Sequence, residues 1–589
     1  MARRDSIMHK PKDSRSALRR MLAFLGPFKL LILLVAVLCV LSNLLSLWGP
    51  HLAGSAINEA AAGKGKVDID KVWYFASRML LCYLCSSLLT VSIHAIMMNV
   101  SRRVAKRMRQ AVFDKLMRLP VGYFDRNQAG DIISRVSYDI DVISTCMATD
   151  VVSILTSSVT VVGSVIMMVS ISLPLSAVVL FSVPAAVLYT AKMRKITQPR
   201  FIKRSKNYGI MNGFVEEMLS GQKTIQAYAY ENRVEKNFDE INTNAAEAYY
   251  DAERYGVTIG PTMGSINNIT LSLIALLGSV LYMGGHITLG SISSFVLYSR
   301  KFSGPINEIA NIINELFSAL AAAERVFNLL DEKEELKDAE NARTLENVKG
   351  DVALQHVAFG YDPGKTIIHD LTMRAEAGKL IAIVGPTGAG KTTIINLLMR
   401  FYDADGGVIT VDGSDIRLCT RSSLRGSYAM VLQDTWVFRG TIFDNIAYGK
   451  DSATMDEVVA AAKAAHIHPF VMRLPQGYQT VISEDGGNIS KGQKQLLTIA
   501  RAMLYDARML ILDEATSNVD TSTEREIQHA MRKLMEGKTC FVIAHRLSTI
   551  QNADLILVLD QGDVVEQGTH QTLMAQKGFY YKLYRSQFE

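Results

Sequence analysis

The chain has 589 residues, of which 49% are hydrophobic and 20% are charged, and its formal net charge is +6. This composition excludes a disordered, collagen-like or coiled-coil protein, and the charge is too weak for a chain of this size to predict nucleic-acid binding. Six cysteines in so long a chain form no disulfide framework, so we expect reduced thiols. The apolar residues are concentrated in the first half, whereas the second half reads as a soluble domain.

Six apolar segments in the first half are predicted to cross a bilayer as helices. They cover residues 28–49, 72–100, 149–171, 174–190, 256–284 and 287 to about 305. Six spans place both chain ends on one side of the membrane. Residues 1–27 carry seven Lys or Arg against two acids, and the connection after the second span is also basic. Because Lys and Arg are enriched in cytoplasmic loops, we predict that both termini are cytoplasmic.

The connections on the predicted inner side, residues 101–148 and 191–255, are long, charged and poor in Pro and Gly. We therefore expect the spans to continue as helices into the cytoplasm, rather than to flank two soluble insertions. Arg300 and Lys301 lie inside the sixth span. They either have a function within the membrane or lie near its inner interface and reach toward water.

A buried strand predicted at residues 380–384 leads into the sequence GPTGAGKT, residues 385–392, and then into an apolar helix over residues 393–399. This matches the phosphate-binding loop G-x-x-x-x-G-K-[ST] in its strand–loop–helix setting. Its glycines let backbone N–H groups turn toward phosphate oxygens, and the helix start adds positive potential. Lys391 is predicted to reach the β- and γ-phosphates, and Thr392 to offer its hydroxyl to Mg²⁺.

Carboxylates and a histidine end two further predicted strands. Residues 509–513 end in Asp513 and Glu514. Asp513 suits the Mg²⁺ shell and Glu514 suits a base that polarises attacking water. A solvated turn is the alternative for two adjacent acids, and the phosphate-binding loop argues against it. The strand over residues 541–544 ends at His545, which could contact a γ-phosphate.

About 120 residues separate Lys391 from Asp513, which predicts an insertion into the nucleotide-binding fold. The insertion contains Gln433, a mostly helical stretch over residues 453–472 and the sequence NISKGQKQ at residues 488–495. Ser490 suits the N-cap position before a helix predicted over residues 495–504, and a helix start suits an anion.

These residues together resemble the ATP-binding cassette (ABC) family over essentially the whole chain, with six spans followed by one cassette as in exporters that carry both parts in one polypeptide. The resemblance implies ATP and Mg²⁺ as cofactors. It makes Tyr361 the aromatic residue that stacks on adenine, and Glu514 and His545 the catalytic glutamate and the switch histidine. It assigns ATP binding also to Gly385, Pro386, Thr387, Gly388, Ala389, Gly390, Lys391, Thr392, Thr393 and Gln433, and the metal shell to Thr392, Gln433 and Asp513.

The resemblance also implies a dimer. In the family, two cassettes enclose two ATP molecules head to tail, so a chain with one cassette needs a second half. Residues 517–520 match the loop that contacts the opposite site, with Asp520 at its end. Residues 123–131 and 221–238 resemble the family's intracellular loops, whose coupling helices we expect near 123–130 and 225–235.

The family signature Leu-Ser-Gly-Gly-Gln is altered here. Residues 489–493 read ISKGQ, so Ser490, Gly492 and Gln493 match and Lys491 replaces the glycine that approaches the partner's ATP. This combination, with Glu514 and His545 intact, resembles the subunit of heterodimeric bacterial exporters that donates the degenerate signature. Its partner would be a different chain that lacks the catalytic glutamate. A harmless substitution in a homodimer is the alternative.

The predicted fold is therefore a membrane domain of six transmembrane helices (residues 1–330), a linker (331–349) and an α/β P-loop nucleotide-binding domain (350–589). The predicted function is ATP-driven export of amphipathic or hydrophobic substrates such as drugs, lipids or peptides across the plasma (inner) membrane, by alternating access. The expected partners are a second half-transporter, the bilayer and a small amphipathic substrate, with no nucleic acid. The alternatives are a homodimeric lipid flippase and an importer of the same fold. The six spans argue against a soluble ABC ATPase, and the predicted catalytic residue Glu514 argues against a channel or a receptor.

Overall fold

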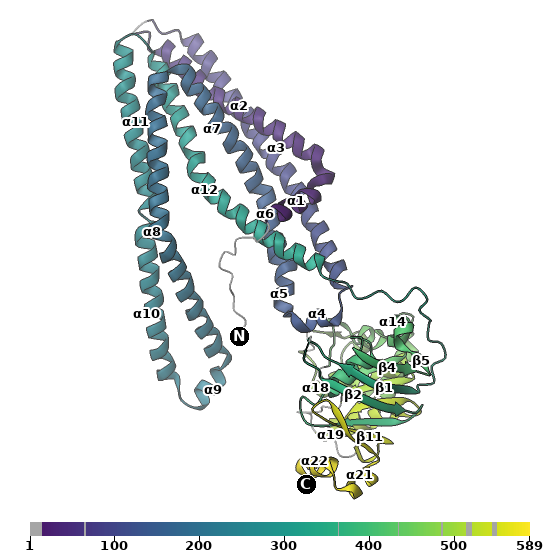
Figure 1. The fold of residues 1–589 in the computed structure, drawn as a ribbon. Coiled ribbons are helices and arrows are strands. Elements are labelled where there is room, and N and C mark those ends of the chain that lie inside the picture. Colours follow the sequence, from purple (N-terminus) through teal and green to yellow (C-terminus); the bar gives the residue numbers. More distant parts are fainter. Residues whose placement is uncertain are drawn as a thin grey trace. The chain divides into compact units, whose positions relative to one another are not determined.

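The computed structural model describes residues 14–63, 66–362, 364–433, 435–483, 487–513, 521–544 and 550–588. The chain forms two compact units (Figure 1). The first comprises Met1–Met117 and Ala129–Glu332, and the second comprises Arg118–Gln128 and Lys333–Glu589. The segment Arg118–Gln128 thus packs with the second unit, although the sequence-based division places it in the membrane domain.

The first unit is helical, and its longest helices extend well past the apolar segments. Each of α3 and α8 has 48 residues and α12 has 43, so at about 1.5 Å per residue α3 and α8 reach roughly 70 Å. The prediction that the spans continue as helices is confirmed. The helices are α1 (Ser14–Leu25), α2 (Lys29–Ala60), α3 (Ile69–Leu116), α5 (Ala129–Ser134), α6 (Ile140–Thr145), α7 (Val151–Ile171), α8 (Leu173–Ser220), α9 (Gln222–Ala227), α10 (Glu231–Gly256), α11 (Ile259–Met283) and α12 (Leu289–Asp331).

Five stretches of described helix are long and apolar enough to cross a membrane: Arg15–Ala60, Ile69–Leu116, Ala129–Ile171, Leu173–Ser220 and Glu231–Met283. They contain the first five predicted spans. The sixth predicted span forms the start of α12, where Arg300 and Lys301 interrupt the apolar run. In the described part of the chain, all six cysteines are free thiols, as expected.

An ion pair fastens α12 to the helical run that begins with α5. Two π-helical turns, Arg135–Asp139 and Cys146–Asp150, widen that run. The Asp139 carboxylate is buried. It accepts two hydrogen bonds from the Arg325 guanidinium, one from Nε at 3.0 Å and one from Nη2 at 2.6 Å. A buried carboxylate needs such pairing, so this contact fixes how α12 packs below the predicted membrane segment.

The second unit is built around two sheets. A six-stranded sheet has the order β12-β11-β3-β10-β9-β6 and is parallel except for its edge strand β12. An antiparallel sheet has the order β2-β1-β4-β5. The strands are β1 (Val352–Phe359), β2 (Ile368–Ala375), β3 (Leu380–Val384), β4 (Gly406–Val411), β5 (Ser414–Asp415), β6 (Tyr428–Val431), β9 (Met509–Asp513), β10 (Thr539–Ile543), β11 (Leu555–Asp560) and β12 (Asp563–Gly568), with a small pair β7 (Gly440–Thr441) and β8 (Val481–Ile482).

The predicted parallel sheet and its strands at 380–384 and 509–513 are confirmed, whereas the antiparallel sheet was not predicted. Its strands β1 and β2 alternate buried and exposed positions only irregularly, because bulges interrupt their pairing. The predicted helical stretch at 453–472 forms α16 (Met455–Ala464) and α17 (His468–Met472). The remaining helices are α13 (Lys391–Leu398), α14 (Arg421–Gly426), α15 (Ile442–Ala447), α18 (Lys491–Tyr505), α19 (Thr521–Met535), α21 (His570–Gln576) and α22 (Phe579–Phe588).

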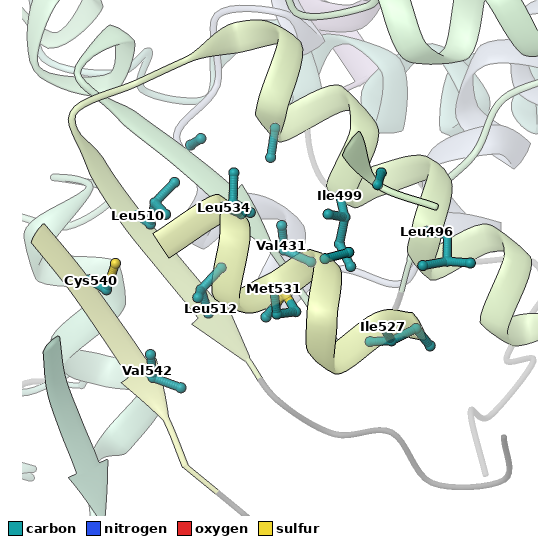
Figure 2. Close-up of a cluster of buried hydrophobic side chains, with 14 of the residues drawn as sticks. Val431, Leu496, Ile499, Leu510, Leu512, Ile527, Met531, Leu534, Cys540 and Val542 are labelled. Atoms are coloured by element: carbon teal, nitrogen blue, oxygen red, sulfur yellow. The ribbon is translucent and has the colours of Figure 1, made fainter. Parts of the chain in front are cut away.

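Both faces of the six-stranded sheet are buried, because side chains alternate along each strand. In β9, Leu510 and Leu512 enter one core, and Met509 and Ile511 enter the other. Figure 2 shows the first core, where α18 and α19 pack against these strands through Leu496, Ile499, Ile527, Met531 and Leu534. The second core holds α13 and the antiparallel sheet. The buried sheet thereby fixes the starts of both α13 and α18.

Candidate functional site

The phosphate-binding loop lies at the carboxyl end of β3 and runs directly into α13. Gly385 permits a tight passage, since a Cβ there would lie 2.4 Å from the backbone oxygen of Leu559. Gly390 immediately precedes α13 with φ of +98°, a left-handed conformation that favours glycine. The two glycines thus let the chain turn from a buried strand into a helix within six residues.

Lys391 is the first residue of α13, and its side chain reaches back to the start of this loop. Its Nζ donates hydrogen bonds to the carbonyl oxygens of Gly385 at 2.8 Å and Pro386 at 2.9 Å. Burial lowers the pKa of Lys391 below its usual 10.5, and the nearby Asp513 carboxylate opposes this shift to a smaller extent. The loop therefore holds a cation at the start of a helix, the arrangement that binds phosphate groups.

The parallel strand order brings further predicted site residues to the same sheet edge. Strand β10 pairs with both β3 and β9, and Ile543 is the register partner of both Ile383 and Asp513. Gln433 is exposed and follows β6, the strand beside β9. Since parallel strands end together at one edge, the phosphate-binding loop, Asp513 and Gln433 follow neighbouring strands at one edge of the sheet. The topology thus groups residues that are far apart in the sequence.

Tyr361 lies beside the start of α13. Its hydroxyl donates to Thr393 Oγ1 at 3.3 Å and accepts a hydrogen bond from Asn396 Nδ2 at 2.9 Å. The ring remains 37% exposed. It packs edge-on against Tyr402, with ring centroids 4.9 Å apart. The tyrosine is therefore held in place from one side and keeps a free surface.

Tyr402 connects this aromatic group to α4 (Val121–Arg126), the segment that the membrane half contributes to the second unit. The Tyr402 hydroxyl donates to Asp125 Oδ2 at 2.6 Å. A Cβ at Gly122 would lie 2.9 Å from the Tyr402 ring, so only glycine fits without a shift. Sequence analysis missed Tyr402, because no local pattern relates it to a residue 277 positions away. The short helix α4 overlaps the first expected coupling region, residues 123–130.

The start of α18 carries the altered signature. Ser490 is the N-cap: its hydroxyl accepts from the Gln493 backbone N–H, and the Gln493 side chain accepts from the Ser490 N–H. The predicted cap is confirmed, but the helix begins four residues before the predicted Gln495, because this reciprocal cap already stabilises Lys491 as its first residue. Lys491 is exposed and Gly492 is buried.

Several predicted residues have no structural account. Glu514, Asp520 and His545 lie outside the described residues. Thr392 is exposed at the start of α13. Among the described residues, no three His, Cys, Asp or Glu side chains form a group that could hold a metal ion. Mg²⁺ in nucleotide sites commonly uses one or two protein oxygens together with phosphates, so Thr392 and Asp513 remain suitable ligands.

Two family models match the chain. The ABC transporter transmembrane region matches residues 30–306, and the ABC transporter model matches residues 368–517. The chain is 43% identical over 580 residues to the ABC transporter ATP-binding protein YfiC of Bacillus subtilis, covering 98% of this chain and 96% of the relative. The chain therefore belongs to the ABC transporter family.

Two further likenesses indicate the type of transporter. A fatty acid ABC transporter ATP-binding/permease protein of Mycobacterium bovis is 44% identical over 525 residues, which covers 89% of this chain and 83% of that protein. The structure of a bacterial Atm1-family ABC exporter with ATP bound has a TM-score of 0.74 and 29% identity, and covers 98% of this chain and 99% of that one. The chain is an ABC exporter half-transporter, a multi-pass membrane protein with an ATP-hydrolysing domain.

The charge of Lys391 yields a prediction about pH. The ammonium can attract phosphates only while it is protonated, and its pKa in the folded protein lies below 10.5. ATP affinity should therefore fall as the pH rises through that lowered pKa. Lys391→Arg should remain protonated over the same range, since the arginine pKa exceeds about 12. Equilibrium binding of ATP to both proteins between pH 7 and pH 10.5 checks this, and parallel losses in the two proteins would contradict it.

Proposed function

We propose that the chain is one half of a heterodimeric exporter that uses ATP to move amphipathic or hydrophobic substrates across the plasma membrane. The observation that carries the nucleotide part is the Lys391 ammonium, bonded within the phosphate-binding loop at the start of α13. ATP phosphates would replace the carbonyls of Gly385 and Pro386 as its partners. The fatty acid transporter among the relatives supports an amphipathic substrate.

We assign the chemistry to residues at the carboxyl edge of the parallel sheet. Tyr361 would stack on adenine, and the loop residues 385–393 would bind the phosphates. Thr392, Gln433 and Asp513 would hold Mg²⁺, which supplies positive charge to the phosphate oxygens when bound. Glu514, next in sequence to Asp513, would polarise the attacking water, and His545 would contact the γ-phosphate.

The dimer is proposed to be asymmetric because of Lys491. Each ATP would lie between the phosphate-binding loop of one half and the signature of the other half. Asp520 of this chain would contact the ATP site on the opposite side of the dimer. The signature here, Ser490, Lys491, Gly492 and Gln493, places a long cation where glycine leaves space. The partner would be a different chain with an intact signature and no catalytic glutamate, so that only the ATP on this chain's loop is hydrolysed. The basic residues 1–27 support cytoplasmic termini.

Glu514→Gln tests the assignment of the base. The amide keeps the shape of the side chain but cannot accept a proton at neutral pH, so ATP hydrolysis by the assembled transporter should fall by at least about a hundredfold. ATP binding should stay within about twofold of the wild type, because the phosphate-binding loop is unchanged. Steady-state hydrolysis and equilibrium ATP binding provide the two measurements. Hydrolysis at the wild-type rate would remove Glu514 from this role.

Native mass spectrometry tests the asymmetry. The 65.0 kDa chain, tagged and purified from its own host in mild detergent, should appear in complex with a second, different half-transporter whose sequence lacks the glutamate. A dimer of this chain alone would refute the heterodimer, and would leave a homodimeric exporter or flippase in which Lys491 permits hydrolysis at two equal sites.

Tyr402→Phe tests communication between α4 and the nucleotide site. The variant keeps the ring that packs on Tyr361 and removes the hydroxyl that donates to Asp125. Stimulation of ATP hydrolysis by the amphipathic dye Hoechst 33342 should fall at least about threefold, since hydrogen bonds to charged groups contribute about 1.5–3 kcal/mol, while the KM for ATP stays within about twofold.

Tyr428→Phe is the matched control for this experiment. The Tyr428 hydroxyl is buried and has no hydrogen-bond partner in the described structure, so its removal should leave dye stimulation intact. If Tyr402→Phe kept full stimulation, or if it raised the KM for ATP without changing stimulation, α4 would not communicate through this contact.

A further inference from the structure

Helices α2 and α12 are joined by a series of polar contacts along one side of α12. From the start of α12 inward, the backbone N–H of Gly290 donates to Asn58 Oδ1 at 2.7 Å. Next, the Ser294 hydroxyl donates to the Pro50 carbonyl at 2.8 Å and the Tyr298 hydroxyl to the Leu47 carbonyl at 2.6 Å. The last contact is made by Lys301, whose Nζ donates to Ser46 O at 2.6 Å and to Ser46 Oγ at 2.5 Å.

These contacts place Lys301 inside the apolar segments of both helices. It lies eleven residues after Gly290, and Ser46 lies twelve residues before Asn58, so each is roughly 16–18 Å along its helix from the first contact. A hydrocarbon core is about 30 Å thick. Lys301 and Ser46 are therefore separated from the first contact by about half of that thickness.

A proline explains the hydrogen bonds of Lys301. Pro50 lies inside α2 and has no N–H, so the carbonyl of Ser46, four residues earlier, lacks its helical donor. Lys301 supplies that donor. The ring of Tyr83 on α3 completes the surroundings: it lies against Gly49, where a Cβ would be 2.3 Å from it, and its centroid is 5.6 Å from Lys301 Nζ.

The positive charge is not explained in the same way, because a neutral donor would satisfy the Ser46 carbonyl. No ion pair of Lys301 is found among the described residues. Residues 30–58, 72–101, 151–190 and 257–307 contain no Asp or Glu, and their charged residues are Arg78, Arg300 and Lys301. An unpaired charge inside these apolar segments is costly and indicates a function.

We propose that Lys301, with Ser46 and Tyr83, binds the anionic headgroup of an amphipathic substrate, a carboxylate or a phosphate, within the membrane domain. The Lys301 side chain is only partly buried and Tyr83 is 37% exposed, so the group is open on one side. An ammonium has three donors, and the third would bond the anion while two remain on Ser46. The proposal rests on the proposed export of amphipathic substrates and specifies the headgroup.

The test compares an acid with its uncharged counterpart. Binding of radiolabelled palmitate and hexadecanol is measured on the complete transporter, with the partner it assembles with, in phosphatidylcholine nanodiscs. The wild type should bind palmitate at least about tenfold more tightly than hexadecanol, because a charge-assisted hydrogen bond is added. Lys301→Gln keeps a donor for the Ser46 carbonyl and removes the charge, so it should lose this preference while binding hexadecanol as before.

Arg300→Gln is the matched control, since it removes the same charge from the neighbouring, exposed position and should keep the preference for palmitate. Lys301→Met, which removes the donor as well, should lower the unfolding temperature more than Lys301→Gln does. Nanodiscs containing phosphatidylglycerol separate the two sources of anion. If its headgroup fills the site, palmitate binding weakens in the wild type and not in Lys301→Gln.

Three results would overturn the proposal: equal affinity of the wild type for palmitate and hexadecanol, a preference that survives Lys301→Gln, or an equal loss in Arg300→Gln. Failure of the proposed export function would be seen separately, as loss of ATP-dependent transport with palmitate binding retained.

Discussion

The turn between β3 and α13 is the constraint on which the nucleotide site depends. Burial of β3 between β10 and β11 in a sheet covered on both faces fixes where the strand ends. Gly385 and Gly390 then let the chain reverse into α13, and Lys391 fills the loop. The same buried sheet aligns the ends of β9 and β6, and its first core supports α18. Apolar packing therefore positions the strands and helices that carry the residues proposed to act on ATP, and hydrogen bonds such as those of Lys391 and Tyr361 add to it.

The membrane half contains a second constraint. It is set by a backbone N–H donor that is missing at a proline, whereas the nucleotide site depends on glycines that lack a side chain. Pro50 leaves the Ser46 carbonyl of α2 without its helical donor, and Lys301 of α12 supplies one. Ser294 and Tyr298 of α12 donate to two further carbonyls of α2. Because unsatisfied backbone groups are costly in lipid, these contacts should hold α2 and α12 together as one body. The contact furthest from Gly290 is made by the charged Lys301, although a neutral donor would satisfy the same carbonyl. This charge indicates a role beyond packing.

Local patterns carried much of the prediction. The strand at 380–384 is an apolar run next to the phosphate-loop motif, the strand at 509–513 is an apolar run that ends in Asp513, and both are present at the predicted residues. Contacts between distant residues could not be predicted. The bond between Tyr402 and Asp125 joins residues 277 positions apart, and nothing near either residue signals it. The antiparallel sheet was missed because bulges disturb the alternation in β1 and β2. The two predicted catalytic residues, Glu514 and His545, and Asp520 of the loop predicted to contact the opposite site lie outside the described residues.

ATP-dependent transport in proteoliposomes tests the central claim most directly. The complete transporter is reconstituted with its cassettes facing outward, and movement of a fluorescent amphipath into the lumen is followed after Mg²⁺ and ATP are added. The account predicts inward accumulation that needs ATP and is absent in Lys391→Met, because export from the cytoplasmic side becomes uptake in this orientation. Accumulation without ATP, equal accumulation in Lys391→Met, or ATP-driven movement out of the lumen would contradict it.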